Sequence, residues 1–231
     1  MKISVAMATY NGEKYIKEQL ESILNQLGKD DEVVVSDDGS TDKTLDIVKS
    51  LKDKRIKIIK GPRKGVKQNF SNAIKHCTGR YIFLADQDDV WMPNKLERVL
   101  KVFENERCSC VVHDAEVFES RTGKIIEPSF FAWRKSGGGI WKNIWRNTYI
   151  GCCMAFSDDM KKYILPIPDD INMHDQWIGI MCEKHGKSAF LKERLVRYRR
   201  HEGNQSEMKH GGVGEMIGKR FRLVRELGRR R

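Results

Sequence analysis

The first half of the chain alternates short apolar runs with segments whose apolar residues recur at helical spacing. Runs of this length predict strands that are buried on both faces, here at residues 3–8, 33–35, 56–59 and 81–85. Three amphipathic helices are predicted between them, on Ile16, Leu20, Ile23, Leu24 and Leu27, on Leu45, Val48 and Leu51, and on Phe70, Ala73, Ile74 and Cys77. This alternation predicts an α/β fold, with a mostly parallel central sheet flanked by helices.

The second half has a less regular pattern. Residues 108–118 predict one or two strands and residues 151–157 another, and a helix is predicted to begin near His174. Three tryptophans, Trp133, Trp141 and Trp145, surround a run of glycines in a stretch with no clean period. We interpret them as core anchors in preference to sugar-binding platforms, because large aromatic side chains dominate cores.

Length and cysteine usage narrow the class of protein. A chain of 231 residues is long enough to bury about 70–75% of its unfolded surface. The six cysteines include no C-x-x-C pair, so we expect reduced, buried thiols and a cytoplasmic protein. The first residues are interpreted as a strand and not as a targeting segment, and no apolar run approaches the roughly 20 residues of a membrane span.

The net charge of +11 is concentrated toward the end of the chain. Residues 215–231 hold seven basic and two acidic residues, which predicts an anionic partner. Ile217, Phe221 and Val224 would share one face of a basic helix there. Such a helix is either solvated or lies on an anionic membrane surface, which would suit a lipid-linked substrate and a peripheral location on the inner face of the membrane.

Acidic residues follow two of the predicted strands. Asp86, Asp88 and Asp89 come directly after residues 81–85, and Asp37 and Asp38 follow residues 33–35. Parallel strands place such turns at one edge of the sheet, where α/β proteins bind ligands. Clustered carboxylates persist most easily beside a cation, although a solvated turn before a helix is the simpler alternative.

These turns carry a family resemblance. Residues 6–11 (AMATYN), 35–42 (VSDDGSTD) and 86–91 (DQDDVW) resemble glycosyltransferase family 2, the inverting sugar-nucleotide transferases of the A-type fold. The resemblance runs from residue 1 to about residue 115. It implies a single domain with a donor-binding half at residues 1–115, an acceptor-binding and catalytic half at 116–210, and a basic tail at 211–231.

The resemblance also implies a nucleotide and metal site. The implied nucleotide contacts are Thr9, Tyr10, Asn11, Asp37, Asp38, Lys67 and Asp86. Tyr10 would pack on the base, Asp38 would accept a hydrogen bond from it, and Asp37 would support the turn. Asp88, with Asp86, would hold Mg²⁺ or Mn²⁺ on the diphosphate. Members of this family often carry an arginine after the third strand, and Lys67 is the nearest counterpart of that arginine here.

Two later stretches complete the implied site. His174-Asp175 stands where the family places an acidic pair, usually Glu-Asp, so Asp175 would be the catalytic base, although an Asp in a first helical turn is by default a cap. His174 and Trp177 would contact the acceptor. His201, in an Arg-x-His-x-x-Asn pattern, would join the metal site or, as the simpler alternative, is a surface residue.

The sequence therefore predicts an inverting, metal-dependent glycosyltransferase. The His-Asp pair resembles rhamnosyltransferase-type members, which favours rhamnose from dTDP-rhamnose, passed to a surface polysaccharide or a lipid-linked acceptor. A UDP-linked glucose, galactose or N-acetylhexosamine remains an alternative donor. A non-enzymatic nucleic-acid-binding module would explain the charge but not the acidic turns, so we expect no nucleic-acid partner.

Overall fold

The computed structural model describes residues 1–202 and 213–230. Within them the strands form one sheet, in the order β3-β2-β1-β4-β8-β6-β9-β5, with β7 paired to β6. The strands are β1 (Ile3–Thr9), β2 (Glu32–Asp37), β3 (Ile56–Lys60), β4 (Tyr81–Asp86), β5 (Val90–Trp91), β6 (Cys110–Glu119), β7 (Ile125–Glu127), β8 (Met154–Ser157) and β9 (Ser188–Arg200).

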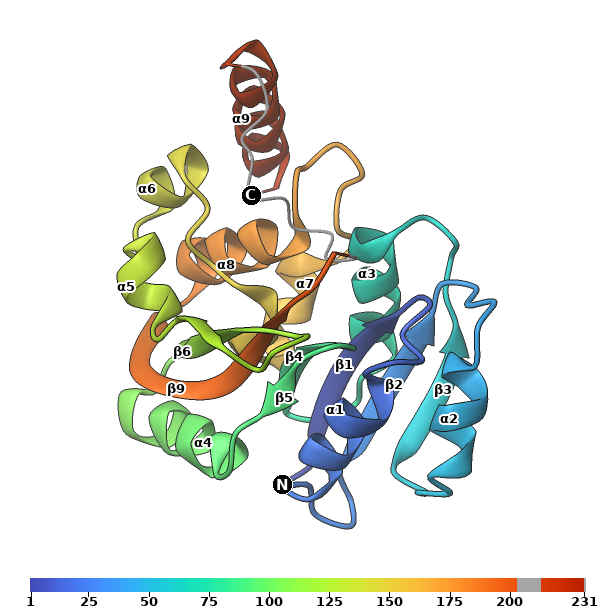
Figure 1. Ribbon diagram of the computed structural model, residues 1–231. Helices are drawn as coiled ribbons and strands as arrows, with labels where there is room; N and C mark the ends of the chain where they lie inside the picture. The colour runs from blue at the N-terminus through green and yellow to red at the C-terminus, as the bar shows by residue number, and fades with distance from the viewer. Residues whose placement is uncertain (203–212, 231) are drawn as a thin grey trace.

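Helices cover both faces of this sheet (Figure 1). The α-helices are α1 (Ile16–Leu24), α2 (Thr44–Ser50), α3 (Val66–His76), α4 (Lys95–Glu106), α5 (Phe130–Arg134), α6 (Ile140–Trp145), α7 (Lys161–Ile164), α8 (His174–His185) and α9 (Val213–Arg229). Two 3-10 turns are η1 (Gly151–Cys153) and η2 (Asp158–Met160). One core lies under α1, α2 and α4, and the other under α3, α7, α8 and α9. Alternate residues of β1 point into each core, as the apolar run predicted.

The N-terminal half is a parallel sheet, as predicted. Strand β1 lies between β2 and β4 and is parallel to both. Ala8 pairs with Ser36 on one side and with Asp86 on the other. The two acidic turns therefore leave the same edge of the sheet from neighbouring strands.

The C-terminal half makes the sheet mixed: β6 and β9 form a long parallel pair, but other strands here run antiparallel to their neighbours. Strand β8 is antiparallel to both β4 and β6, and β5 is antiparallel to β9. The chain leaves β6 at the same edge as the acidic turns and stays there through α5 and α6, so β8 has to run back across the sheet. Residues 151–153 form a 3-10 turn before β8 and are not part of the strand.

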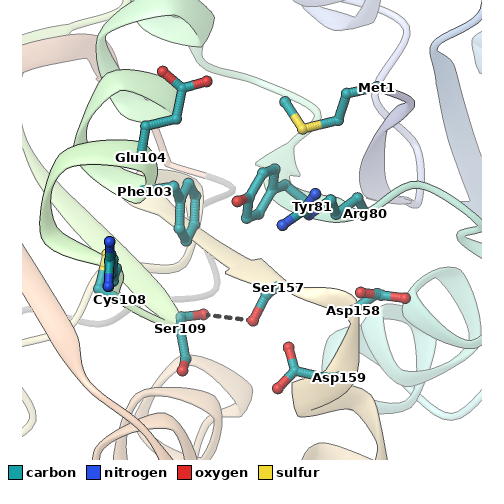
Figure 2. A pocket seen from close by; sticks show the side chains of 11 residues that line it. Met1, Arg80, Tyr81, Phe103, Glu104, Cys108, Ser109, Ser157, Asp158 and Asp159 are labelled. Carbon is teal, nitrogen blue, oxygen red and sulfur yellow. Dashed lines mark hydrogen bonds between the residues drawn. The ribbon is translucent and has the colours of Figure 1, made fainter.

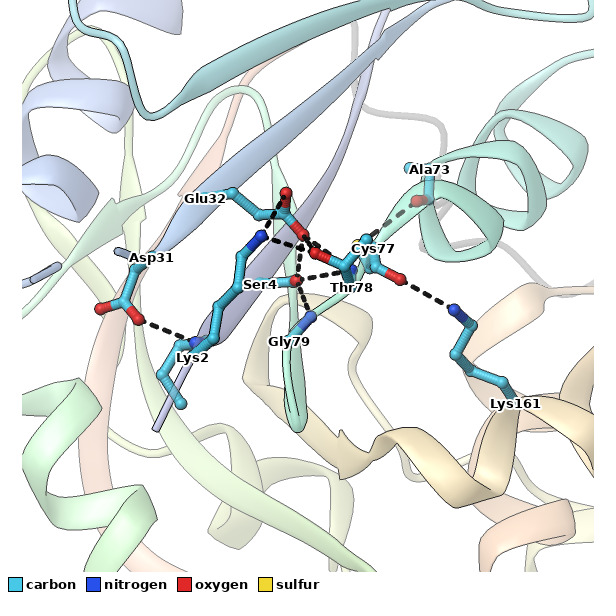
Figure 3. Close-up of polar contacts among 10 residues, drawn as sticks. Lys2, Ser4, Asp31, Glu32, Ala73, Cys77, Thr78, Gly79 and Lys161 are labelled. Carbon is cyan, nitrogen blue, oxygen red and sulfur yellow. Dashed lines mark hydrogen bonds and ion pairs between the residues drawn. The ribbon is translucent and has the colours of Figure 1, made fainter. Parts of the chain in front are cut away.

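A polar network holds the opposite, amino edge of the sheet together (Figure 3). Glu32 accepts hydrogen bonds from the hydroxyls of Ser4 and Thr78, the amide of Thr78 and the ammonium of Lys2. Burial alone would raise the pKa of Glu32, but these hydrogen bonds outweigh it and lower the pKa to about 2. Gly79 packs so closely on β1 that a Cβ atom would lie 2.5 Å from the amide nitrogen of Ser4.

Two predictions about side-chain burial have different outcomes. All six cysteines are free and buried, which confirms the expected thiols. Trp141 and Trp145, by contrast, are 72% and 64% exposed, and Trp133 is 37% exposed, so the interpretation of these residues as core anchors is wrong. They lie on the short helices α5 and α6, which cover the sheet with other residues. No helix within the described ranges is long and apolar enough to span a membrane.

Candidate active site

The turn after β2 is built around Asp37. Its carboxylate accepts hydrogen bonds from the amides of Gly39 and Ser40 and from the hydroxyls of Ser40 and Thr9. Asp37 and Thr9 are both buried. They shape the turn from inside, as expected for Asp37, and they place its backbone at the sheet edge.

Asp38 and Tyr10 follow the neighbouring strands β2 and β1, and their side chains have different surroundings. The two carboxylate oxygens of Asp38 accept hydrogen bonds from the amides of Arg63 and Gly65, at 2.6 and 2.8 Å. Tyr10 is 54% exposed, and the side-chain amide of Gln87 pairs with its backbone amide and carbonyl. The exposed ring of Tyr10 thus offers a face at the sheet edge on which a flat ligand group could stack.

Asn11 and Lys67 hold loops in this conformation. Asn11 adopts a left-handed backbone (φ 49°), and its side-chain oxygen accepts a hydrogen bond from the amide of Thr41. The ammonium of Lys67 donates to the carbonyls of Asp169 and Ile171, at 2.7 and 2.6 Å. Lys67 therefore ties α3 to the segment before α8.

The second acidic turn brings Asp88 and His201 together. Nε2 of His201 lies 2.7 Å from Oδ2 of Asp88, and the imidazole stacks on the ring of Tyr15 at 4.7 Å. The end of β9 is fixed to this turn, because the Arg199 side chain donates to the backbone carbonyl of Asp88. The grouping of Asp88 with His201 that the sequence pattern predicted is present. Asn204, the last residue of that pattern, lies outside the described residues.

Asp89 is a buried carboxylate of this turn to which the sequence analysis gave no role. One oxygen accepts a hydrogen bond from the amide of Arg199 at 2.9 Å, and the other accepts none from any described N–H or O–H group. Oxygens of Asp86 and Asp89 and the sulfur of Cys152 all lie within 4.8 Å of one another. Burial and the charge of Asp88 raise the pKa of both Asp86 and Asp89.

This crowding suits a divalent cation. A buried carboxylate oxygen that no described N–H or O–H group contacts, next to further carboxylates, is costly unless positive charge compensates it. Carboxylate oxygens are the ligands that Mg²⁺ and Mn²⁺ prefer, whereas a thiol suits softer metals. By their chemistry Asp86 and Asp89 therefore fit the predicted ion and Cys152 does not, whereas Asp88 lies outside this group, with its Oδ2 against His201.

A buried lysine lies within reach of the same carboxylates. Lys95 has no exposed surface, and its ammonium donates to the carbonyl of Cys152 at 2.8 Å and lies 4.1 Å from the Trp91 ring centre. Burial lowers the pKa of Lys95 to about 8, against the opposing charges of Asp89 and Asp86. Helical spacing does not distinguish Lys95 from a solvated residue, so its burial beside these carboxylates could not be predicted from the sequence.

Asp175 opens α8 and faces the acidic turn. Its Oδ1 accepts hydrogen bonds from the amide of Gln176 at 2.6 Å and from the side chain of Asn147 at 3.0 Å. Burial raises the pKa of Asp175 to about 6, although both hydrogen bonds oppose the rise. The charge of Asp175 contributes to the raised pKa of Asp86, so the two carboxylates lie within electrostatic range of each other. A pKa near neutrality is typical of a general base.

The expected acceptor contacts of His174 and Trp177 are not available in this structure. His174 is 3% exposed, stacks on Phe70 at 4.1 Å, and has a pKa lowered by burial to about 3. Trp177 has no exposed surface, and its indole nitrogen donates to the carbonyl of Ile164. The first turns of α8 are buried all round, so these two rings are core residues.

A separate hollow of about 530 Å³ lies at the amino edge of the sheet (Figure 2). Its lining includes Tyr81, the first residue of β4, and Ser157, which pairs with Tyr81. Because Asp86 ends the same strand, this hollow is on the opposite edge from the acidic turns. It takes no part in the candidate site.

Residues 4–165 match the family described as Glycosyl transferase family 2. The chain belongs to this family. Among its relatives, an uncharacterised glycosyltransferase of Nostoc sp. is 29% identical over 214 residues, which are 88% of this chain and 66% of that protein. The dTDP-rhamnosyl transferase RfbG of Shigella flexneri is 30% identical over 218 residues, 86% of this chain and 73% of that protein.

Other members differ in the sugar that their names give. A UDP-Glc:α-D-GlcNAc-diphosphoundecaprenol β-1,3-glucosyltransferase of Escherichia coli, WfgD, is 30% identical over 159 residues, 68% of this chain and 60% of that protein. The matches cover 66% of the Nostoc protein and 60% of WfgD, so the chain spans less than two thirds of the length of these relatives.

Solved structures confirm the fold. S. aureus TarS, residues 1–349 in complex with UDP-GlcNAc, superposes with a TM-score of 0.77 at 21% identity, over 100% of this chain and 66% of that one. The mannosyltransferase PcManGT of Pyrobaculum calidifontis, with GDP-Man and Mn²⁺, superposes with a TM-score of 0.58 at 21% identity, over 83% of this chain and 54% of that one. At these identities the likeness shows the A-type fold alone.

Proposed function

We propose that this protein transfers a sugar from a nucleoside-diphosphate donor to a hydroxyl of a saccharide acceptor, with inversion at the anomeric carbon. The observation that carries the proposal is the position of Asp175. Asp175 is buried at the start of α8 and is held by hydrogen bonds from Gln176 and Asn147. It lies within electrostatic range of Asp86 at the end of β4, the sheet edge where α/β proteins bind ligands.

Asp175 acts as the general base in this proposal. It takes the proton of the acceptor hydroxyl while that oxygen forms a bond to the anomeric carbon. The bond between the anomeric carbon and the diphosphate breaks, and the nucleoside diphosphate leaves with the electron pair. Asn147 and the amide of Gln176 both donate to Oδ1 and so hold the carboxylate in one orientation.

The acidic turn binds the diphosphate end of the donor. Asp88 and Asp86 would hold Mg²⁺ or Mn²⁺, with His201 as a further ligand and Asp89 behind them. When bound, the ion supplies the positive charge that stabilises the leaving diphosphate. His201 already lies against Asp88, and Tyr15 supports its ring from behind.

The first acidic turn binds the nucleoside. The exposed ring of Tyr10 offers a stacking surface for the base, and Asp38 keeps lone pairs available beside its two backbone partners. Thr9, Asn11 and Asp37 shape the turn around them. Lys67 would reach the nucleotide only by leaving the carbonyls of residues 169 and 171.

Rhamnose from dTDP-rhamnose is our first choice of donor. The His174-Asp175 pair and the similarity to a Shigella protein named as a dTDP-rhamnosyl transferase support it. A UDP-linked glucose, galactose or N-acetylhexosamine is the alternative, supported by the E. coli relative whose name specifies UDP-Glc. That name also specifies a diphosphoundecaprenol acceptor, which supports a lipid-linked acceptor for this chain.

The proposal is tested by donor turnover. Purified protein is incubated with dTDP-rhamnose and the UDP-sugars, Mn²⁺, and lipid extracts or synthetic lipid-linked saccharides, and the released nucleotide is measured. We expect Asp175→Asn to lower turnover by about 10²–10⁴-fold, while nucleotide binding stays within twofold. Asp30→Asn, which changes an exposed carboxylate far from the site, is the matched control. Normal turnover in Asp175→Asn would refute the assignment.

A further inference from the structure

Helices α6 and α9 expose large apolar side chains next to each other. The exposed fractions are 72% for Trp141, 64% for Trp145, 57% for Ile217, 70% for Phe221 and 41% for Val224. These five residues are called the α6–α9 surface. Large apolar side chains gathered on one surface are unusual in a protein that meets only water.

Helix α9 is anchored by its opposite side. Leu223 and Leu227 are 2% and 9% exposed and pack in the core under α8. The guanidinium of Arg230 donates to the carbonyls of Leu165 and Pro166, and Lys184 donates to the carbonyl of Leu227. Leu223 and Leu227 therefore attach α9 to the core, whereas the exposed side chains of Ile217, Phe221 and Val224 form a separate face of the helix.

The exposed stripe of α9 lies beside the flank of the helix that contacts α6. At about 100° per residue, Ile217, Phe221 and Val224 fall within about 60° of one another. Arg220 lies between this stripe and the core-facing stripe, donates to the carbonyl of Trp145 at 2.8 Å, and stacks on its ring at 4.5 Å. Figure 1 shows α6 and α9 together at one end of the molecule.

Positive charge surrounds these apolar side chains. Between residues 217 and 230 there are six basic residues, Lys219, Arg220, Arg222, Arg225, Arg229 and Arg230, and one acidic residue, Glu226, a net charge of +5, and Arg225 forms an ion pair with Asp170 outside this range. Lys142 and Arg146 add to this charge from α6 and its end. Tryptophan prefers the boundary between water and lipid, and cationic side chains are attracted to anionic headgroups.

Two other occupants fit this surface less well. A second copy of the chain would bring two surfaces of the same strong positive charge face to face. A nucleic acid would match the charge, but it offers no partner for the aliphatic side chains of Ile217 and Val224. An anionic lipid leaflet matches both the charge and the apolar stripe.

The surface is also connected to the candidate base. Asn147, two residues after Trp145, donates its hydrogen bond to Asp175, and the carbonyl of Asn143 in α6 accepts one from Gln176. We propose that the α6–α9 surface lies on a membrane leaflet that contains anionic lipids and so presents Asp175 to an acceptor anchored in that leaflet. The lipid contact stands on the surface alone, whereas the acceptor's position rests on the proposed function.

Vesicle co-sedimentation tests the lipid contact without any donor. Wild type is expected to pellet with vesicles that contain about 30% phosphatidylglycerol, to bind pure phosphatidylcholine at least tenfold more weakly, and to be released by salt. Trp141→Ser with Phe221→Ser should weaken binding to the anionic vesicles at least tenfold. The control pair Ile125→Ser with Ile126→Ser, which removes apolar side chains that are 49% and 46% exposed on β7, should bind as wild type does.

Three results would overturn the proposal: no binding to anionic vesicles, equal loss of binding in the control pair, or a concentration-dependent dimer that the Trp141→Ser/Phe221→Ser variant abolishes. Circular dichroism checks that each variant is folded. Asp175→Asn should bind vesicles as wild type does even though it loses turnover. Turnover of a soluble acceptor by a protein that binds no vesicles would refute the surface and leave the proposed function standing.

Discussion

Removing the amide that holds Asp175 should move the acidic limb of the pH profile. The proposed base must be ionised to accept a proton, so kcat/KM should fall as the pH drops below about 6, the pKa of Asp175. Asn147 donates a hydrogen bond to the ionised carboxylate and thereby lowers its pKa. Asn147→Ala removes that stabilisation, so the pKa should rise and the limb should move toward higher pH.

The size of this movement follows from the hydrogen bond. A hydrogen bond to a charged group contributes about 1.5–3 kcal/mol, and water replaces part of it in the variant, which leaves about 1.4 kcal/mol. Because 1.36 kcal/mol corresponds to one pKa unit, the limb should move from about 6 to about 7. Turnover relative to wild type would then fall about fivefold at pH 6 and by only about a tenth at pH 8.

The assay is nucleotide release between pH 5 and 9 at low donor concentration, in wild type and two variants. Asn147→Asp should move the limb further in the same direction, since it adds a negative charge while keeping the oxygen that accepts from the amide of Tyr149. Asn105→Ala, at an exposed position on α4, is the control. An acidic limb that is absent, or that stays at the wild-type position in both variants, would refute the role of Asp175.

Three further predictions concern stability and ion binding. Glu32→Gln should lower the free energy of unfolding by about 1–2 kcal/mol at pH 7. The pKa of Glu32 is about 2 in the folded protein and 4.5 for an unperturbed glutamate, so the stability lost in the variant should shrink as the pH falls from 4.5 to 2. A stability difference in urea titrations that does not change with pH would contradict this. Lys95→Met should tighten Mn²⁺ binding severalfold in calorimetry, because it removes a cation near the acidic turn. The same variant should have a lower melting temperature, because the Cys152 carbonyl loses its hydrogen bond. Unchanged Mn²⁺ affinity would argue against an ion site beside Lys95. Gly79→Ala should destabilise by about 1–3 kcal/mol in urea, whereas Gly228→Ala, with open space around it, should not; equal stabilities would refute the packing argument.

The sheet edge that carries the acidic turns was predictable because its features are local. Short apolar runs, two of them followed by acidic turns, predict neighbouring parallel strands, and the pairing of Ala8 with Ser36 and Asp86 confirms this. The direction of β8 was not predictable in this way. It depends on the edge at which α5 and α6 hold the chain, and no periodicity within residues 151–157 records that.

The candidate site was predictable where a motif marks it and not where packing creates it. Asp88 and His201 are far apart in the chain, yet a sequence pattern links them and the structure brings them to 2.7 Å. Lys95 and Asn147 have no such pattern, since their roles come from contacts with residues distant in the sequence. The exposed Trp141 was misjudged because a large aromatic ring gives the same sequence signal in a core and on an interaction surface.

The most direct test of the central claim is calorimetric titration of UDP, dTDP and GDP, with and without Mn²⁺, into wild type, Asp88→Ala and the control Asp30→Asn. We predict that UDP or dTDP binds wild type and the control with Mn²⁺, and that binding weakens at least tenfold when either the ion or the Asp88 carboxylate is removed. Nucleotide binding that needs neither Mn²⁺ nor Asp88, or no binding of any nucleotide, would contradict a nucleotide-sugar site at the acidic turns.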